Sequence, residues 1–397
     1  MSPSNPFVAG ARLQDLQKFV GREEELRAIA GLMSGDQPTS VNLVGDRRIG
    51  KSSLLYYFFR TWKQRVLNHS NYVVIYLSLQ LARCQRENNF YQAVVEELLD
   101  SDAVAKKTSL VEGLSKIPVD RLAFSEAIAQ FKEQGLLPVL CLDDFDSLFK
   151  YPQEFDNGFY DSLRAMMDNN AIMLVIVSRK PLEIHGEEHR FVSGFFNLGH
   201  TIELRELTID EAIALTRLTI NTNQGKQPAL SLDEQNYAQQ WGKRNPYLLQ
   251  LAGLCLYEAQ QNGQDIKWAR KKFEQQINKS RSRFIKRFSQ YWWQWLLLVI
   301  GLIVLILAII YWTKGGIFAI PPIKELLGTP LAIGNVLDDI AKVLIGIIVL
   351  ALPILFVTGK LSWKDFLAFV SKIIKKALPW EELKEFFQKL SSRNRKK

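Results

Sequence analysis

Hydrophobic residues along the chain form two patterns, which change at about residue 279. Before that point, short apolar runs of strand length alternate with stretches in which apolar residues recur at helical spacing. The short runs are Val41–Val44, Tyr72–Leu79, Leu137–Leu142 and Ala171–Val177, and the helical stretches include Phe90–Leu99 and Arg121–Gln134. Strands that alternate with helices predict a doubly wound parallel sheet, whose ligands bind at the carboxyl ends of the strands.

Two much longer apolar runs follow in the last third of the chain. Trp292–Trp312 is interrupted only by Gln294 and has aromatic residues at both ends, as expected of a helix that spans the bilayer and is anchored at both interfaces. Ile340–Thr358 carries Lys342 and Pro353 near its ends, which a membrane helix tolerates. The two runs predict a C-terminal transmembrane α-helical hairpin.

The charge distribution supports this topology. Residues 279–397 contain 19 Lys and Arg against 7 Asp and Glu, whereas residues 1–278 contain 31 against 34. The basic residues cluster before the first run and after the second, so the positive-inside rule places both flanks in the cytoplasm and the connecting segment outside the plasma (inner) membrane. The basic excess is then explained by a lipid membrane, and no specific nucleic acid partner is expected. The basic tail has helical spacing, and it could lie on the membrane or pack on the protein's own domain.

A phosphate-binding loop follows the first apolar run. The pattern GxxxxGKS occurs between a strand and a helix, which is the context that this motif requires. Glycines let backbone N–H groups surround phosphates, the lysine contacts the β- and γ-phosphates, and the serine hydroxyl ligates Mg²⁺. We therefore expect ATP and Mg²⁺ to bind at Gly45, Asp46, Arg47, Arg48, Ile49, Gly50, Lys51 and Ser52.

Acidic residues end the third apolar run. Asp143 is the expected Mg²⁺-side carboxylate, and Asp144 is placed to orient or deprotonate the attacking water, although Asp144 could instead cap the following helix. Asp146 is expected to act as a cap or lie at the surface. Ser178 and Arg179 end the fourth run, where they could position water or sense phosphate as catalytic residues, or could simply be solvated.

With these residues the sequence resembles the STAND and AAA+ branch of P-loop ATPases, in particular the STAND-type ATPases of prokaryotes. Phe19–Leu26 resembles the hhGRE element, which implies that Val20, Gly21 and Arg22 line the adenine pocket. Gly45–Ser53 matches the GxRRxGKSS form of the Walker A motif, which adds Ser53 to the nucleotide-binding residues. Leu140–Asp144 matches the Walker B motif.

The resemblance extends to a helical lid. Ser178 and Arg179 correspond to the sensor strand, and Glu203–Leu207 with Asp210–Ala212 correspond to the start of the lid. Arg244–Leu249 resembles the GxP region, which implies that Pro246 contacts the nucleotide. Asp144 stands where AAA+ members usually have Glu, which is compatible with slow hydrolysis. The chain lacks the long repeat array of many STAND proteins, and the membrane hairpin stands in its place.

The sequence thus predicts an α/β P-loop NTPase fold, AAA+/STAND-like, with a helical lid and a transmembrane hairpin. The predicted parts are the ATPase domain (1–204), the lid and connecting helix (205–290), the hairpin (291–358) and the cytoplasmic tail (359–397). We expect a membrane-anchored, slow Mg-ATPase that acts as a signalling or defence switch, either as a homo-oligomer or with a partner protein. The alternative is a non-catalytic, nucleotide-binding scaffold that anchors a partner at the membrane. His185–His189 fits the HxxEH zinc pattern, but no third ligand is evident, so no zinc site is expected. A loop is expected there instead.

Overall fold

The computed structural model describes residues 4–115, 120–198, 200–222 and 225–279. The two long apolar runs and the basic tail lie outside these residues, so the transmembrane hairpin stays a prediction. Within the described ranges, no helix has the length and apolar character needed to cross a membrane.

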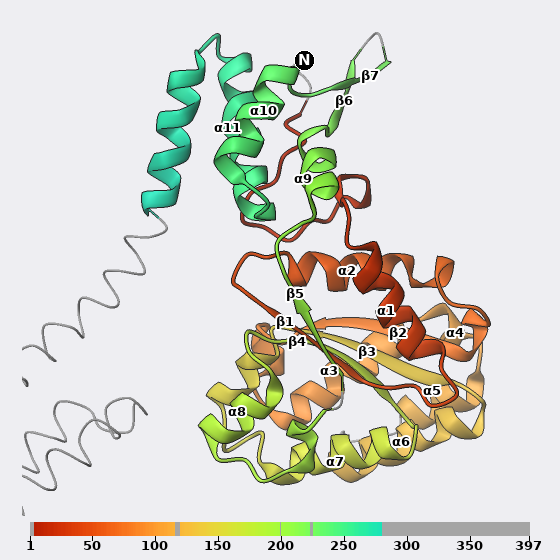
Figure 1. Ribbon diagram of the computed structural model, residues 1–397. Helices are drawn as coiled ribbons and strands as arrows, with labels where there is room; N and C mark the ends of the chain where they lie inside the picture. Colours follow the sequence, from red (N-terminus) through yellow and green to blue (C-terminus); the bar gives the residue numbers. More distant parts are fainter. Residues whose placement is uncertain (1–3, 116–119, 199, 223–224, 280–397) are drawn as a thin grey trace, which may run out of the picture. The chain divides into compact units, whose positions relative to one another are not determined.

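A five-stranded sheet forms the centre of the α/β domain (Figure 1). All of its strand pairs are parallel, which confirms the predicted parallel sheet. In spatial order the strands are β2 (Tyr72–Ser78), β3 (Leu137–Asp143), β4 (Met173–Val177), β1 (Val41–Gly45) and β5 (His200–Leu204). Because β4 lies between β1 and β3, its carboxyl end lies between the ends of the strands that lead into the phosphate loop and into the acidic residues.

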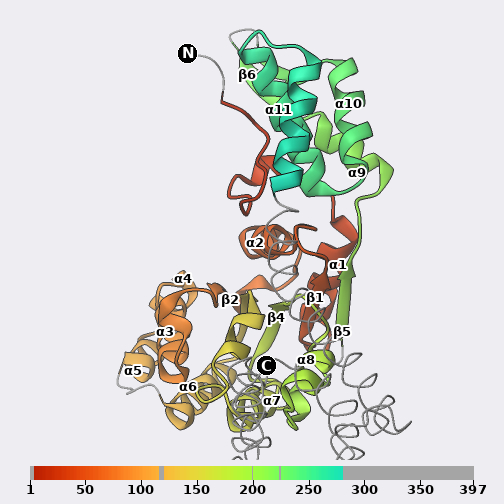
Figure 2. The same cartoon turned by 90° about the vertical axis from the view of Figure 1, so that its left-hand side faces the viewer.

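Helices cover both faces of the sheet (Figure 2). On β3, Leu140 and Leu142 pack into one core while Val139 and Cys141 pack into the other. Burial on both faces explains why the central strands appear in the sequence as continuous apolar runs. One face is covered by α1 (Glu23–Ser34) and α2 (Lys51–Thr61), and the other by α3 (Glu87–Leu99), α6 (Arg121–Glu133) and α7 (Asn157–Asp168). Three shorter helices are α4 (Asp102–Ala105), α5 (Thr108–Ser115) and α8 (Leu182–His189).

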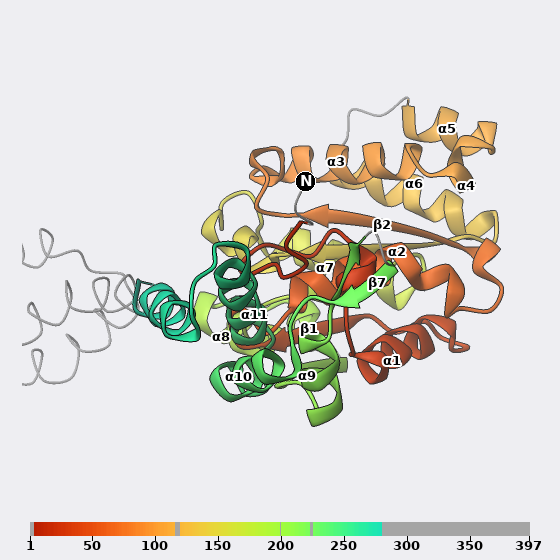
Figure 3. The same ribbon diagram turned by 90° about the horizontal axis from the view of Figure 1, so that it is seen from above.

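The lid is a separate helical core that follows β5. Figure 3 shows its three labelled helices side by side: α9 (Ile209–Thr216), α10 (Leu232–Gly242) and α11 (Pro246–Gln261). The hairpin of β6 (Thr219–Thr222) and β7 (Gly225–Pro228) lies between α9 and α10 in sequence, and a further helix runs over 266–279. Glu203 and Leu204, which the resemblance assigned to the start of the lid, instead lie in β5 and pair with β1.

Residues 5–13, which we call the N-terminal arm, connect the lid with the phosphate loop helix. Phe7 is buried in the lid core, and the Val8 amide donates to Gln250 Oε1 at 2.8 Å. Further along, the Leu13 amide donates to Ser53 Oγ at 3.2 Å, on α2. The arm therefore belongs structurally to both parts, although it precedes the α/β domain in sequence.

Candidate nucleotide site

The phosphate loop joins β1 to α2 and depends on two glycines. Gly45 has φ +143°, and a Cβ built there would lie 2.6 Å from the carbonyl oxygen of Leu204 on the neighbouring strand β5. Gly50, directly before α2, has φ +102°. Both backbone conformations are ones that side chains rarely adopt, so the loop geometry explains the two glycines of the motif.

Lys51 lies across this loop at the start of α2. Its Nζ donates to the carbonyl oxygens of Gly45 at 2.6 Å and Asp46 at 2.9 Å, and the residue is 9% exposed. Burial lowers the lysine pKa, and the carboxylates of Asp146 and Asp46 oppose that effect. Two of the three ammonium protons are thus used, and one remains for a phosphate oxygen.

Asp143, at the end of β3, is fixed by three donors. Its Oδ1 accepts from Ser52 Oγ at 2.9 Å and from the Asp144 amide at 2.9 Å, while its Oδ2 accepts from the Tyr76 hydroxyl at 2.7 Å. The carboxylate is buried, at 3% exposure. A hydroxyl and a carboxylate oxygen side by side form a hard oxygen donor set, which fits Mg²⁺. Ser52 and Asp143 would hold that ion, which would neutralise phosphate charge.

Asp144 adopts φ +56° and occupies the N-cap position of the short 3₁₀ helix Phe145–Lys150. Asp144 thus takes the position that the capping alternative predicts, but its side chain makes no capping hydrogen bond. Burial raises its pKa to about 6, and the neighbouring carboxylates of Asp143 and Asp146 add to the increase. A carboxylate with a pKa near 6 is a suitable proton acceptor at neutral pH.

Asp146 does not serve as a cap or a surface residue, which corrects the expectation from sequence. Its side chain is 10% exposed, accepts from the Arg179 amide at 3.1 Å and lies 2.7 Å from His185 Nε2. Burial favours a higher pKa, but the contacts with His185 and Arg179 outweigh it, so the pKa of Asp146 is lowered.

The loop expected at His185–His189 is also wrong, because these residues end helix α8. Within the described ranges, no three or more His, Cys, Asp or Glu residues are placed to share a metal ion.

Ser178 and Arg179 follow β4, between the phosphate loop and Asp143. The Ser178 hydroxyl is buried, 2.8 Å from Asn42 Oδ1 on β1 and 2.6 Å from the carbonyl oxygen of Lys180. The Arg179 side chain is 66% exposed, and its Nε lies 3.5 Å from Asp146 Oδ2. Their positions match the expected sheet edge, and their role in sensing phosphate stays a prediction.

The Gly21–Arg22 turn connects the phosphate loop with the lid. Arg22 is 5% exposed, and its Nη2 donates to the carbonyl oxygens of Ile49 at 3.3 Å and Arg205 at 2.6 Å. Its backbone amide donates to Glu211 Oε1 at 2.5 Å, on α9. Gly21 has φ +77°, and a Cβ there would lie 2.5 Å from the same carboxylate. The sequence pattern predicts that this turn belongs to the site, but it does not predict the contact with Glu211.

A second contact between loop and lid involves the basic part of the phosphate loop. Arg48 adopts φ +70°, and its guanidinium lies 4.2 Å from the centroid of the Tyr247 ring. Tyr247 follows Pro246, the first residue of α11, so the region with the predicted nucleotide contact does adjoin the loop. Val20 packs against the lid core, while Asp46 and Arg47 are exposed.

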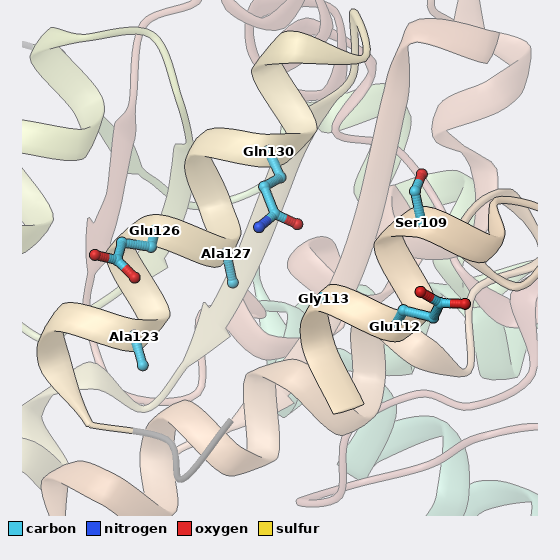
Figure 4. Close-up of a pocket in the computed structure, with 7 residues that line it drawn as sticks. All are labelled: Ser109, Glu112, Gly113, Ala123, Glu126, Ala127 and Gln130. Carbon is cyan, nitrogen blue, oxygen red and sulfur yellow. The ribbon is translucent and has the colours of Figure 1, made fainter. Parts of the chain in front are cut away.

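A cavity of about 390 Å³ lies elsewhere, between α5 and α6 (Figure 4). Ser109, Glu112, Glu126 and Gln130 supply its polar lining. None of its lining residues belongs to the phosphate loop or to the acidic residues after β3, so this cavity is distinct from the nucleotide site.

Comparisons with known proteins agree with this fold. Residues 18–176 match a family model described as an AAA ATPase domain. No curated protein matches the chain in sequence. The N-terminal part, with its parallel sheet and phosphate loop, therefore has the fold of an AAA-type P-loop ATPase.

Several solved structures are similar at low identity. The Walker-type ATPase of Pyrococcus abyssi is 14% identical, with a TM-score of 0.48, and the match covers 71% of this chain and 78% of that one. The Aeropyrum pernix ORC1 protein, solved in complex with DNA, is 13% identical, with a TM-score of 0.44 and 65% of each chain covered. Domain III of the Thermotoga maritima replication initiation protein DnaA is 14% identical, with a TM-score of 0.41, covering 67% of this chain and 98% of that one.

Proposed function

We propose that the protein is a membrane-anchored ATPase switch of the STAND type. In this proposal Mg-ATP bound between the sheet and the lid controls oligomerisation and the state of the C-terminal hairpin, with a signalling or defence output. The observation that carries the proposal is the convergence of Lys51, Ser52, Asp143 and Asp144 at the strand ends, where the lid contacts the same loop.

Each of these residues has a task that its environment suits. The loop amides and Lys51 bind the phosphates, since a helix N-terminus and an ammonium both attract anions. Ser52 and Asp143 present oxygen ligands to Mg²⁺. Asp144, whose pKa is raised to about 6, accepts a proton from the attacking water.

In this proposal the lid responds to bound nucleotide through two contacts with the site. Arg22 bonds the phosphate loop at Ile49 and the segment after β5 at Arg205, and Arg48 stacks on Tyr247 of α11. A phosphate that draws Arg48 or the loop towards itself would therefore change lid packing. The described helix over 266–279 precedes the predicted first membrane span in the sequence. In this proposal a helix continuous with that span carries lid motion into the bilayer, which a flexible linker would not do.

The catalytic part of the proposal is tested with the full chain in detergent by replacing Asp144 with Asn. Binding of Mg-ATP should persist, while turnover should fall by about 10²- to 10⁴-fold, because an amide cannot accept the proton. Asp161→Asn, which changes an exposed aspartate on α7, serves as the matched control and should keep turnover at the wild-type level. Unchanged turnover in Asp144→Asn would mean that Asp144 is not the base.

The switch part is tested by exchanging Trp292–Thr358 for an unrelated two-span hairpin. ATP hydrolysis should remain, while any ATP-dependent effect on membrane permeability or growth upon overexpression should disappear. A scaffold that only anchors a partner would tolerate the exchange, so a retained phenotype would favour that alternative.

A further inference from the structure

Tyr76 donates a hydrogen bond to the Asp143 carboxylate. The two residues lie on the neighbouring strands β2 and β3, and the phenolic hydroxyl donates to Oδ2 at 2.7 Å while Ser52 donates to Oδ1 at 2.9 Å. Without this donor, rotation of the carboxylate would be opposed only by contacts on the Oδ1 side.

Aromatic and cationic contacts hold the Tyr76 ring. Tyr56 meets it edge to face at a centroid distance of 5.4 Å, and Phe59 lies 5.8 Å away. The Arg12 guanidinium lies over both tyrosines, 4.2 Å from the Tyr56 centroid and 4.7 Å from that of Tyr76. A guanidinium over an aromatic face is attractive, so Arg12 favours one position of the ring.

Arg12 belongs to the N-terminal arm, which is also attached to the lid. Phe7 is 3% exposed in the lid core, and Asn5 Nδ2 donates to the carbonyl oxygen of Leu254 on α11 at 3.3 Å. The arm therefore contacts the lid near its beginning and the metal side of the nucleotide site near its end.

We propose that Tyr76 is a positioning residue for Mg²⁺ binding and that Arg12 of the N-terminal arm holds it in place. The hydroxyl determines which oxygen of Asp143 faces Ser52, and the arm makes this arrangement depend on lid docking. The inference rests on the proposed Mg-ATP site, and it adds two residues that the phosphate-loop and acidic motifs do not contain.

The test measures how much Mg²⁺ strengthens nucleotide binding in the full chain. Affinity for a non-hydrolysable ATP analogue is determined with Mg²⁺ and with EDTA. In Tyr76→Phe the affinity in EDTA should stay at the wild-type value, while the gain from Mg²⁺ should fall about tenfold, as expected for one hydrogen bond to a charged group. Tyr56→Phe is the matched control, since its hydroxyl accepts from Arg60 and does not contact Asp143. It should respond to Mg²⁺ as the wild type does.

Arg12 supplies an independent variant. Arg12→Gln should reduce the Mg²⁺ gain about threefold, in keeping with a cation–π contact that acts through the ring, and Arg12→Lys should restore part of it. A normal Mg²⁺ gain in Tyr76→Phe overturns the inference and leaves the proposed function intact. If Tyr76→Phe does not fold, a normal gain in well-folded Arg12→Gln overturns it. Failure of the wild type to bind the analogue at all would contradict the proposed function itself.

Discussion

Replacing Asp144 with Asn should stabilise the nucleotide-free protein while it impairs turnover. In the folded protein, burial and the nearby carboxylates raise the pKa of Asp144 from 3.8 to about 6. The folded state thus holds this proton more tightly than the unfolded state does. Stability contributed by the protonated form is present at acidic pH and is lost as the pH rises through 6, so the charged carboxylate destabilises the fold at neutral pH.

The gain in stability expected for Asp144→Asn follows from the raised pKa of Asp144. A shift of about two pKa units corresponds to about 3 kcal/mol as an upper limit, at about 1.4 kcal/mol per unit. Because the Asp144 side chain is only half-buried, solvent screening reduces this to roughly 1.5 kcal/mol. For a domain of this size that gain raises the melting temperature by about 3–6 °C.

The measurement is a thermal unfolding series of the full chain in detergent, without nucleotide and with EDTA, between pH 4 and pH 8. The gain of Asp144→Asn over the wild type should be full above pH 7 and should shrink steadily towards pH 4, where the aspartate is protonated in the folded state and partly protonated in the unfolded state. Asp146→Asn should behave in the opposite way, because the contacts with His185 and Arg179 lower the pKa of Asp146. Its substitution should destabilise the protein at pH 7.5. A pH-independent gain, or a loss of stability at pH 7.5 in Asp144→Asn, would refute this reasoning.

Three further outcomes are expected. Gly21→Ala should destabilise the lid contact by about 1–3 kcal/mol in thermal unfolding, because its Cβ meets Glu211, whereas Gly31→Ala in open space on α1 should be neutral or stabilising. Phe7→Ala should cost about 3–5 kcal/mol in the same assay, and a smaller loss would show that the arm is not docked in solution. A cysteine at Gly316 should be labelled from outside intact cells and one at Ser392 should not; labelling of both or neither contradicts the two-span hairpin.

The central strands and the phosphate loop could be predicted because their signals are local. Leu137–Leu142 is buried on both faces and is therefore apolar throughout, and Gly45 and Gly50 are required by backbone geometry within one short loop. The edge strand β5 could not be predicted from the sequence, because its residues are largely exposed and polar and form no apolar run.

Contacts between distant segments could not be derived from pattern alone. Tyr76 is 67 residues from Asp143, and only the pairing of β2 with β3 brings them together. Phe7 lies in an N-terminal stretch without helix or strand periodicity, yet it packs in the lid core. Asp146 resembled a cap in sequence, and its contact with His185 depends on the packing of α8.

The most direct test of the nucleotide-binding claim is equilibrium ATP binding by the full chain with Lys51→Ala. Removal of the ammonium leaves the phosphate charge uncompensated at the loop, so binding should be abolished. Lys63→Ala, which removes an exposed lysine just beyond α2, should bind ATP as the wild type does. Equal ATP affinity in the wild type and Lys51→Ala would contradict the assignment of this loop as the nucleotide site.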